Sequence, residues 1–368
     1  MKRVGNIYSE MLKIENIRKA ILDASRYKRN KKHVQLVLTN IEYYSTQIQE
    51  MLLNKTYVPS EFTEEKIVDK SGGKERLICK TNFFPDQIIH WVLINAIKDI
   101  LSRGMYKYSC GSVKDRGPLY ASDVLKAKIK SDYKNTKYCL KIDIKKYYES
   151  VDHDCLKASF RKVIKDKDCL WLIDTIIDSH PGLPIGTYTS QWFSNFYLQD
   201  LDHFIKEKLG IKYMVRYMDD VVMLGGNKKL LHKARIAIEE FLRNKKLKLK
   251  ENWQVFKVAS RDGKYKGRAI DFAGYKLYKD CRTIRKRTFR RIRRCIFRIS
   301  KHLTLKRART FMSYYGYIKH SDSSTLTAKY FKLISVKKIR KCISEGGNSN
   351  ENIPKSFKGS PGTSKSYA

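Results

Sequence analysis

The stretch IKYMVRYMDDVVMLGG, residues 211–226, decides the fold because it sets two adjacent aspartates inside an apolar strand pattern. The apolar side chains on either side of Asp219 and Asp220 predict a strand, an acidic turn and a second strand. Adjacent carboxylates repel each other, and an apolar strand does little to stabilise them. Because Asp also suits β-turns for structural reasons alone, the pair gains catalytic meaning only from the order and spacing of other residues.

A third aspartate lies in KYCLKIDIKKYYESVDH, residues 137–153. Alternation predicts a strand there, with Asp143 on the face opposite to the apolar residues. Those apolar residues are Tyr138, Leu140, Ile142 and Ile144. If this strand neighbours the hairpin, three carboxylates meet at one end of a sheet. Phosphoryl transfer uses two divalent cations about 3.5–4 Å apart, and Mg²⁺ prefers oxygen ligands, so Asp143, Asp219 and Asp220 are the predicted catalytic and metal-binding residues.

The composition of the 368 residues indicates a polyanionic partner. Lys and Arg number 77 against 37 Asp and Glu, which gives a formal net charge of +40. Such an excess destabilises a compact fold by self-repulsion, and nucleic acid is the usual polyanion that explains it. The alternative is a basic surface that is merely solvated. The hydrophobic content of 42% is typical of a globular chain, and the length allows two or three lobes.

The eight cysteines are scattered, without a C-x-x-C pair or a His at zinc spacing. This usage favours reduced thiols in a cytosolic protein. The N-terminus lacks the apolar core of a signal peptide, and no run of about 18 apolar residues is present to span a membrane. We therefore expect a cytoplasmic protein with no membrane partner.

The remaining periodicity predicts helices over 10–53, a hairpin with its turn at SGG, residues 71–73, and then a long helix. From 137 to 280 the order is strand, helix, helix, strand–turn–strand, helix, strand, strand, an α+β pattern related to ferredoxin-like palms. Thirteen Lys and Arg lie in the segment from Arg282 to Arg309, with an apolar stripe at helical spacing formed by Ile292, Ile296, Ile299 and Leu303. A solvated helix face is the alternative for this basic run. The Gly-, Ser- and Pro-rich end of the chain predicts disorder.

Three segments together resemble a reverse transcriptase: YMDD at 217–220, KIDIKKYYESVDH at 141–153 and GLPIGTYTSQWFSNFYL at 182–198. The resemblance extends from about residue 50 to residue 340. It implies the right-hand polymerase fold, which is α+β with fingers, a ferredoxin-like palm and a helical thumb. It also implies an RNA-directed DNA polymerase, a nucleotidyltransferase that uses dNTPs, a template RNA, an RNA/DNA hybrid and two Mg²⁺ ions, with Mn²⁺ as a substitute.

The implied domains follow one another along the chain. They are an N-terminal helical extension at 1–50, fingers at 51–136, a palm at 137–280 with fingers-side helices at about 155–182, a basic helical thumb at 281–345 and a disordered tail at 346–368. No RNase H, integrase or nuclease pattern is visible, so we expect other proteins to degrade the template and cut DNA.

The family's motifs also imply which residues bind the nucleotide. Asp143 and Tyr148 match the motif D-x-x-x-x-F/Y, which makes Tyr148 the steric gate against a 2′-OH, although a plain core aromatic is the alternative. In the same motif, Ile144 lends its backbone carbonyl to a metal. GGKERLI at 72–78 resembles the segment that holds the triphosphate, or else carries solvated charges, and LKLKENWQVFKV at 247–258 resembles a strand with a lysine near the pyrophosphate, where Lys248 and Lys250 are both candidates. The implied dNTP-binding residues are Lys74, Arg76, Tyr148, Ile185, Gly186, Gln191 and Lys250.

Two further segments resemble the family's nucleic-acid contacts. FAGYKL at 272–277 resembles the hairpin that grips the primer, where a glycine permits close backbone approach. The basic run after residue 281 corresponds to the thumb, which grips the duplex backbone. The implied nucleic-acid-binding residues are Tyr217, Met218, Gly274, Tyr275, Arg290, Arg291 and Arg294.

A change in one motif resembles the reverse transcriptases of diversity-generating retroelements. Group II intron and retron enzymes usually carry Gln-Gly and then Ser-Pro, whereas this chain has Ile185-Gly186 and then Ser190-Gln191. The stretches at 108–121 and 313–323 also look like that group, although Met218 stands where the group commonly has Ala or Val. The resemblance implies error-prone cDNA synthesis for mutagenic retrohoming, a bacterial or phage-encoded gene and a small basic accessory protein that assembles as a ring.

Two alternatives remain open at this point. One is a bacterial antiphage-defence enzyme or a retron or group II-like reverse transcriptase, which shares the chemistry but not the biology. The other is a non-catalytic RNA-binding protein on a polymerase scaffold, in which charge and tyrosines would survive. The intact Asp143, Asp219, Asp220 and Tyr148 argue against the second alternative.

Overall fold

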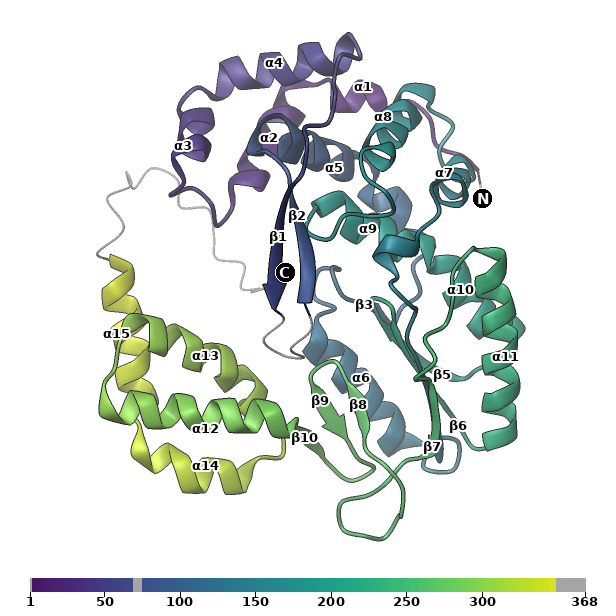
Figure 1. Cartoon of the computed structure of the whole chain (residues 1–368), viewed down its shortest axis with the longest axis vertical. Helices are drawn as coiled ribbons and strands as arrows, with labels where there is room; N and C mark the ends of the chain where they lie inside the picture. The colour runs from purple at the N-terminus through teal and green to yellow at the C-terminus, as the bar shows by residue number, and fades with distance from the viewer. Residues whose placement is uncertain (1, 69–74, 349–368) are drawn as a thin grey trace.

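The structure is a computed structural model, and it describes residues 2–68 and 75–348 (Figure 1). Figure 1 shows the N-terminal helices at one end, the sheet that contains β3, β5, β6 and β7 towards the other, and a separate group of C-terminal helices to one side. The structure therefore combines helices and sheets, as the α+β pattern predicted. Among the described residues, no helix combines the length and the apolarity that crossing a bilayer requires.

The N-terminal third is helical apart from one hairpin. Its helices are α1 Tyr8–Met11, α2 Ile14–Ser25, α3 Lys32–Thr39, α4 Ile41–Leu53 and α5 Ile88–Ser102, with the π-helical turn η1 Phe83–Gln87 before α5. Helix α5 packs against α2 through fully buried residues such as Ile17, Ile21 and Leu93. The hairpin pairs β1 Thr63–Val68 with β2 Glu75–Lys80 in antiparallel register. The predicted SGG turn and Lys74 lie outside the described residues.

The central sheet has the strand order β3-β5-β6-β4-β7. The strands are β3 Ser109–Cys110, β4 Tyr138–Ile142, β5 Tyr213–Tyr217, β6 Asp220–Gly225 and β7 Gln254–Lys257. Strand β3 runs parallel to β5, whereas the other neighbours are antiparallel. Strand β4 lies directly beside β6, with Ile142 opposite Val221. The strand that leads to Asp143 is therefore the neighbour of the hairpin, which is the arrangement on which the three-carboxylate prediction depended.

Each face of this sheet packs on a different helix, because alternate side chains point to opposite faces. Leu140, Val221 and Met223 share a core with the face that α11 Lys228–Asn244 covers. Cys139 and Val222 lie in a second core with Leu125 of α6 Pro118–Ser131. Lys141 and Asp143 follow Cys139 at two-residue spacing, and Asp220 precedes Val222 at the same spacing. Their side chains therefore point to the same face of the sheet as this second core, the face that packs on α6.

The helices between β4 and β5, and the elements after the sheet, complete the described chain. Between the strands lie η2 Tyr148–Ser150, α7 His153–Arg161, α8 Lys167–Asp178, α9 Tyr188–Tyr197, α10 Gln199–His203 and η3 Phe204–Lys208. A second sheet, ordered β10-β9-β8, contains β8 Ile270–Phe272, β9 Tyr275–Leu277 and β10 Arg282–Ile284. It leads into α12 Lys286–Lys301, α13 Leu305–Lys319, α14 Ser324–Tyr330, η4 Phe331–Leu333 and α15 Val336–Asn348.

The C-terminal helices surround their own apolar core. Ile292, Ile296 and Ile299 of the predicted stripe are buried there, together with Phe311 and Ile318. Leu303, the last member of the stripe, is partly buried and follows the end of α12.

Residues 346–348, which were expected to belong to a disordered tail, lie at the end of α15, because this helix continues to Asn348. A side chain at Gly346 would come within 2.8 Å of the Leu305 side chain, so the glycine permits close packing of α15 on α13. The rest of that predicted tail lies outside the described residues.

Candidate active site

The three aspartates meet at one end of the five-stranded sheet. Asp143 directly follows β4, Asp220 is the first residue of β6, and Asp219 lies in the turn before it. Tyr217 pairs with Asp220 across that turn, which leaves Met218 and Asp219 as its two central residues. The structure therefore brings together residues that are 77 positions apart in the sequence, as Asp220 and Asp143 are.

Burial and the repulsion between neighbouring carboxylates make Asp219 and Asp220 hard to ionise. Burial, and after it the neighbouring Asp143 carboxylate, raise the pKa of Asp219 to about 7. Burial also raises the pKa of Asp220 to about 6, while Lys141 acts in the opposite direction. Such shifts are typical of carboxylates that share a site of low polarity. A site that binds divalent cations would relieve the repulsion.

Two lysines partly neutralise the aspartates. The Nζ atom of Lys141 lies 3.0 Å from Asp220 Oδ2, and the Nζ atom of Lys250 lies 3.0 Å from Asp143 Oδ2. Asp220 Oδ1 is buried without a hydrogen-bond partner among the described residues. Three converging carboxylates, one with an unsatisfied buried oxygen, form the hard oxygen donor set that Mg²⁺ or Mn²⁺ prefers. The residues present therefore fit divalent cations. Ile144, whose backbone carbonyl was the predicted metal ligand, is buried and forms an isolated antiparallel β-bridge with Leu249.

The turn that carries Asp219 has a strained backbone. Met218 adopts a φ of 56°, in a region that residues other than glycine seldom occupy. Two hydrogen bonds hold it there: the Met218 amide donates to the Cys110 carbonyl at 3.0 Å, and Arg216 Nη1 donates to the Met218 carbonyl at 3.0 Å. Gly111 lies so close that a Cβ there would meet the Met218 side chain at 2.7 Å. The turn is therefore fixed from β3 as well as from β5.

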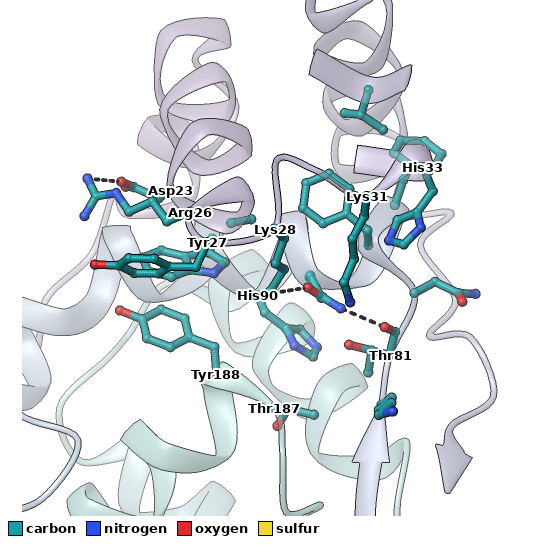
Figure 2. A pocket seen from close by; sticks show the side chains of 18 of the residues that line it. Asp23, Arg26, Tyr27, Lys28, Lys31, His33, Thr81, His90, Thr187 and Tyr188 are labelled. Atoms are coloured by element: carbon teal, nitrogen blue, oxygen red, sulfur yellow. Dashed lines mark hydrogen bonds and ion pairs between the residues drawn. The ribbon is translucent and has the colours of Figure 1, made fainter. Parts of the chain in front are cut away.

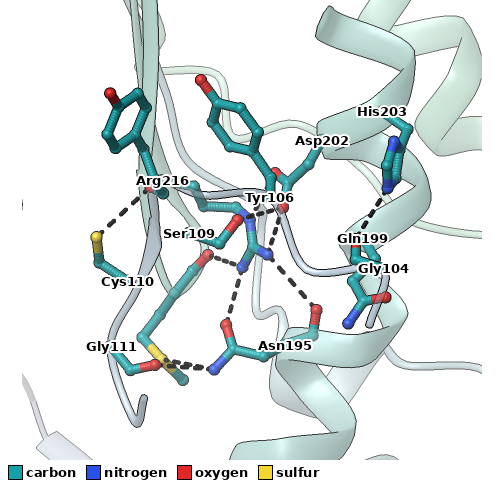
Figure 3. Close-up of polar contacts among 12 residues, drawn as sticks. Gly104, Tyr106, Ser109, Cys110, Gly111, Asn195, Gln199, Asp202, His203 and Arg216 are labelled. Atoms are coloured by element: carbon teal, nitrogen blue, oxygen red, sulfur yellow. Dashed lines mark hydrogen bonds and ion pairs between the residues drawn. The ribbon is translucent and has the colours of Figure 1, made fainter. Parts of the chain in front are cut away.

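Arg216 is the centre of a buried polar network beneath this turn (Figure 3). Its side chain is fully buried and forms an ion pair with Asp202 of α10 at 2.6 Å, and Asp202 is equally buried. Arg216 Nη1 also donates to Asn195 Oδ1 at 3.0 Å, and Asn195 Nδ2 donates to the Gly111 carbonyl at 2.9 Å. Figure 3 shows these side chains converging on the guanidinium from α9, α10 and the segment around β3. The network positions the turn that carries Asp219, and sequence reasoning did not identify it.

The predicted nucleotide-binding residues lie around Tyr148. The Tyr148 hydroxyl accepts a hydrogen bond from Ser194 Oγ at 3.3 Å, and its carbonyl accepts from the Leu183 amide at 2.7 Å. Burial raises the pKa of Tyr148 to about 12, and the positive charge of Arg76 acts in the opposite direction. Arg76 is exposed on β2, so its charge reaches Tyr148 from the hairpin. The structure thus places Arg76 and the predicted steric gate near each other.

The loop with Ile185 and Gly186 is attached to the same hairpin. The Cys79 amide of β2 donates to the Ile185 carbonyl at 2.8 Å. Gly186 has a φ of 126°, and a Cβ there would meet the Cys79 carbonyl oxygen at 2.7 Å, so this position requires glycine. Of the two candidate lysines, Lys250 contacts Asp143, whereas Lys248 is exposed.

Comparison with known families identifies the chain. A profile of the family "Reverse transcriptase (RNA-dependent DNA polymerase)" matches residues 68–277, which is more than half of the sequence. The chain belongs to the reverse transcriptase family. Members of this family are nucleotidyltransferases that generally depend on divalent metal ions, and the matched region contains all three aspartates.

No curated protein sequence matches this chain. Among solved structures it is similar to an apo telomerase from Candida tropicalis truncated from its C-terminal domain, with 15% sequence identity and a TM-score of 0.43. The similarity covers 63% of this chain and 58% of that chain, so this reverse transcriptase spans less than two thirds of the telomerase's length.

The predicted primer-contacting residues of this reverse transcriptase lie in the second sheet and beside it. Ala273 and Gly274 form the turn between β8 and β9, with φ values of 46° and 89°. A Cβ at Gly274 would meet the Tyr317 ring at 2.8 Å. Tyr275 is buried against the same ring, with 5.3 Å between ring centroids. Burial raises the pKa of Tyr217, and the neighbouring Tyr317 acts in the same direction. Tyr217 therefore lies near this hairpin.

The predicted thumb arginines lie on α12 of this reverse transcriptase. Arg290 and Arg294 are exposed and Arg291 is half-buried. Arg291 and Arg294 line a cavity of about 440 Å³ between α12 and α13, whereas Arg290 is not among its lining residues. The other lining residues are Cys295, Arg298, Lys306, Arg307, Thr310 and Tyr314. Among the described residues, no acidic side chain lines this cavity, so it offers a concentrated positive charge to a phosphate backbone.

A larger cavity of about 1060 Å³ opens between α2, α3 and the start of α5 (Figure 2). Gly186 and Gln191, both predicted dNTP-binding residues, are among its lining residues. Figure 2 shows Tyr27 and Tyr188 on one side of the cavity and Lys31 with His33 on the other. Aromatic rings and ammonium groups therefore face one space beside the predicted nucleotide site.

Proposed function

We propose that this protein is a DNA polymerase that copies an RNA template, extending a primer with dNTPs. The observation that carries the proposal is the convergence of Asp143, Asp219 and Asp220 at one end of the sheet, with Asp220 Oδ1 buried and unsatisfied among the described residues. Bound Mg²⁺ ions would activate the primer 3′-hydroxyl and stabilise the leaving pyrophosphate. The residues 51–136, 137–280 and 281–345 would then act as fingers, palm and thumb.

The side chains around the carboxylates have distinct roles in this proposal. The three aspartates hold the cations, and the hydrogen-bonded Met218 turn fixes the position of Asp219. Lys141 and Lys250 contact the carboxylates, so their ammonium groups lie beside the place where the aspartates would hold cations. Lys250 would also pair with the negative charge of the triphosphate, with Arg76 approaching from the hairpin. Tyr148 would exclude the 2′-hydroxyl of a ribonucleotide.

A primer-extension assay tests this function directly. The full chain is incubated with a primed RNA template, Mg²⁺ and labelled dNTPs, and the extension products are separated by length. Extension that depends on the template sequence and is lost in the Asp219→Asn variant supports the polymerase. If the chain binds the primed template but extends nothing, even with its accessory protein present, it is a non-catalytic RNA-binding protein.

We also propose that the larger cavity receives the unpaired template strand next to the nucleotide site. Proteins that bind single strands combine a positive groove with aromatic faces on which bases stack. Trp91 and Tyr188 are already stacked, with 3.9 Å between ring centroids, and Tyr27 is 93% exposed. Burial lowers the pKa of Lys28, and the charge of Lys31 lowers it further. A phosphate backbone would relieve that repulsion.

Tyr27→Ala is expected to weaken binding of a template with a single-stranded 5′ extension about tenfold. Loss of one base–aromatic stack costs about 1–3 kcal/mol, and about 1.4 kcal/mol corresponds to a factor of ten. Binding of a blunt RNA/DNA hybrid should not change, because no unpaired base is present to enter the cavity. Fluorescence anisotropy with both substrates measures the difference.

Tyr133→Ala is the matched control, because it removes a 44% exposed tyrosine that does not line the cavity. It should leave the affinity for both substrates unchanged. Equal losses for the extended and blunt substrates in Tyr27→Ala would contradict a role for the cavity in holding the template.

We propose further that the enzyme serves a diversity-generating retroelement and copies its template with frequent errors at adenines. The support is Ile185, which is partly buried beside Gly186 and has no side-chain group that could hydrogen-bond a nucleotide. A site that lacks hydrogen bonds to the substrate discriminates less against a mispair. Template RNA and a basic ring-forming accessory protein would be its partners, and a template and variable repeat near the gene would support this role.

Ile185→Gln is expected to lower the error frequency at template adenines about tenfold. The glutamine amide would add one hydrogen bond to the bound nucleotide. Such a bond is worth about 1 kcal/mol, or somewhat more where it discriminates a correct base pair from a mispair. Sequencing of pooled cDNA measures the error spectrum, and Ile185→Leu is the control that keeps an apolar side chain of similar volume. An unchanged spectrum in Ile185→Gln would show that the absent amide does not cause the errors.

A further inference from the structure

The hairpin β1–β2 brings a cysteine, a histidine and a glutamate together outside the active site. Glu64 and Cys79 are direct partners across the antiparallel register of the hairpin. His180 approaches from the loop after α8, with its Nε2 atom 3.5 Å from Cys79 Sγ. The three potential ligand atoms all lie within 4.8 Å of one another. These residues are 116 positions apart at their extremes, so no spacing in the sequence reveals the cluster.

The geometry of the cluster fits a tetrahedral zinc ion. Zinc bonds to thiolate sulfur at about 2.3 Å and to imidazole nitrogen at about 2.0–2.1 Å, and a tetrahedral angle then puts the two ligand atoms about 3.6 Å apart. The observed separation of 3.5 Å needs no rearrangement of Cys79 or His180. Glu64 is exposed, so its carboxylate can adjust by a rotamer change. Water would be the fourth ligand.

The surroundings of the cluster also suit a metal ion. Cys79 is 3% exposed, and the Phe62 ring packs edge-on against the His180 ring at 5.2 Å. His180 Nδ1, which would carry the ring proton when Nε2 binds a metal, is buried and has no hydrogen-bond partner among the described residues. Packing against Phe62 and the bond to the metal would therefore hold the imidazole in place. One thiolate, one carboxylate and a neutral imidazole would balance the charge of Zn²⁺, while the Cys79 thiol loses its proton to solvent.

We propose that Glu64, Cys79 and His180 form a zinc site that ties the β1–β2 hairpin to the loop leading to Gly186. The Cys79 amide holds the Ile185 carbonyl, and Gly186 packs on the Cys79 carbonyl oxygen. A metal bond at Cys79 would therefore fix both the hairpin that carries Arg76 and the Ile185–Gly186 segment. The ion has a structural role here and is separate from the carboxylate site, since it uses a softer ligand set.

Titration of the full chain with Co²⁺ tests the site. Cobalt bound to a thiolate in a tetrahedral site gives a sulfur-to-metal charge-transfer absorption and strong visible bands, which cobalt on carboxylates lacks. We expect one equivalent with these bands, their displacement by Zn²⁺, and their loss in both Cys79→Ser and His180→Gln. Zinc affinity should fall by more than about 100-fold in either variant, because even loss of a second-shell partner costs about 10–100-fold.

Three comparisons keep the test decisive. Cys281→Ser, which removes a half-buried cysteine elsewhere, should keep the bands. Asp219→Asn should also keep them, so failure of the zinc site and failure of the polymerase proposal are distinguishable. Absence of the bands in the wild-type chain, or their persistence in both Cys79→Ser and His180→Gln, overturns the proposal and leaves a thiol–imidazole hydrogen bond. If Cys79→Ser does not fold, as judged by circular dichroism, His180→Gln decides alone.

Discussion

Asp219→Asn is expected to lower the rate of primer extension at least about 1000-fold and, at the same time, to raise the melting temperature of the metal-free protein. The loss of activity follows from the loss of a cation ligand, because metal stabilisation of the developing charge is worth several kcal/mol and about 1.4 kcal/mol corresponds to a factor of ten. The amide is nearly the same size as the carboxylate, so the turn should keep its shape. Single-turnover primer extension with saturating dNTP measures the rate.

The gain in stability follows from the electrostatics of the metal-free site. The pKa of Asp219 is raised from 3.8 to about 7, first by burial and then by Asp143. A carboxyl group whose pKa is higher in the folded protein stabilises the fold below its unfolded pKa, and that contribution is lost as the pH rises through about 7. The wild-type protein without metal should therefore become less stable between about pH 4 and pH 7, and Asp220, with a pKa of about 6, should add to this trend.

The amide introduced by Asp219→Asn cannot ionise, so the variant should lose part of this pH dependence. At pH 8 we expect a melting temperature at least about 1 °C above that of the wild type, since relief of about 1 kcal/mol shifts the melting temperature of a chain of this size by about 1 °C. Asp99→Asn, at an exposed position on α5, is the matched control and should change neither the rate nor the stability. Equal melting temperatures of wild type and Asp219→Asn at pH 8 would contradict a strained carboxylate site.

The candidate active site was predictable from the sequence where the two-residue period of a strand carries the information. Alternation placed Asp143 opposite the apolar face of its strand, and the structure has it on the α6 face with Asp220. The same alternation puts Lys141 on that face, so its contact with Asp220 was open to prediction from the sequence, but only once β4 and β6 were known to be neighbours. Pairing between strands depends on contacts that are distant in sequence, and a single sequence does not specify them.

Other parts of the structure left little or no indication in the local sequence. Strand β3 has only two residues and is defined by its parallel pairing with β5. No strand was predicted there, because two residues are too few to show an alternating pattern. Helix α6 was also not predicted, although Pro118 at its start is typical of a first helical turn. Cys79 and His180 meet only because the loop after α8 returns to β2, so cysteine spacing gave no indication of a metal site. Arg216 did leave a signal, because a charged residue in the apolar strand YMVRY requires a buried partner.

Arg216→Met is expected to lower the melting temperature by roughly 5 °C and to abolish most primer extension. Removing one partner of a buried ion pair leaves an uncompensated charge and costs about 3–5 kcal/mol, which corresponds to a shift of roughly 5 °C in a chain of this size. The side chain also holds the Met218 carbonyl at 3.0 Å, so its loss releases the strained turn that positions Asp219. Thermal unfolding and primer extension are measured on the same preparation.

The double variant Arg216→Met, Asp202→Leu separates the two roles of the guanidinium. Replacing both charges by apolar side chains removes the buried unpaired carboxylate, so most of the lost stability should return. Primer extension should not return, because neither Met nor Leu donates a hydrogen bond to the Met218 carbonyl or to Asn195 Oδ1. Recovery of both stability and activity in the double variant would mean that Arg216 only neutralises Asp202. Recovery of stability alone would show that Arg216 holds the Met218 backbone in its strained conformation and thereby positions Asp219 at the proposed metal site.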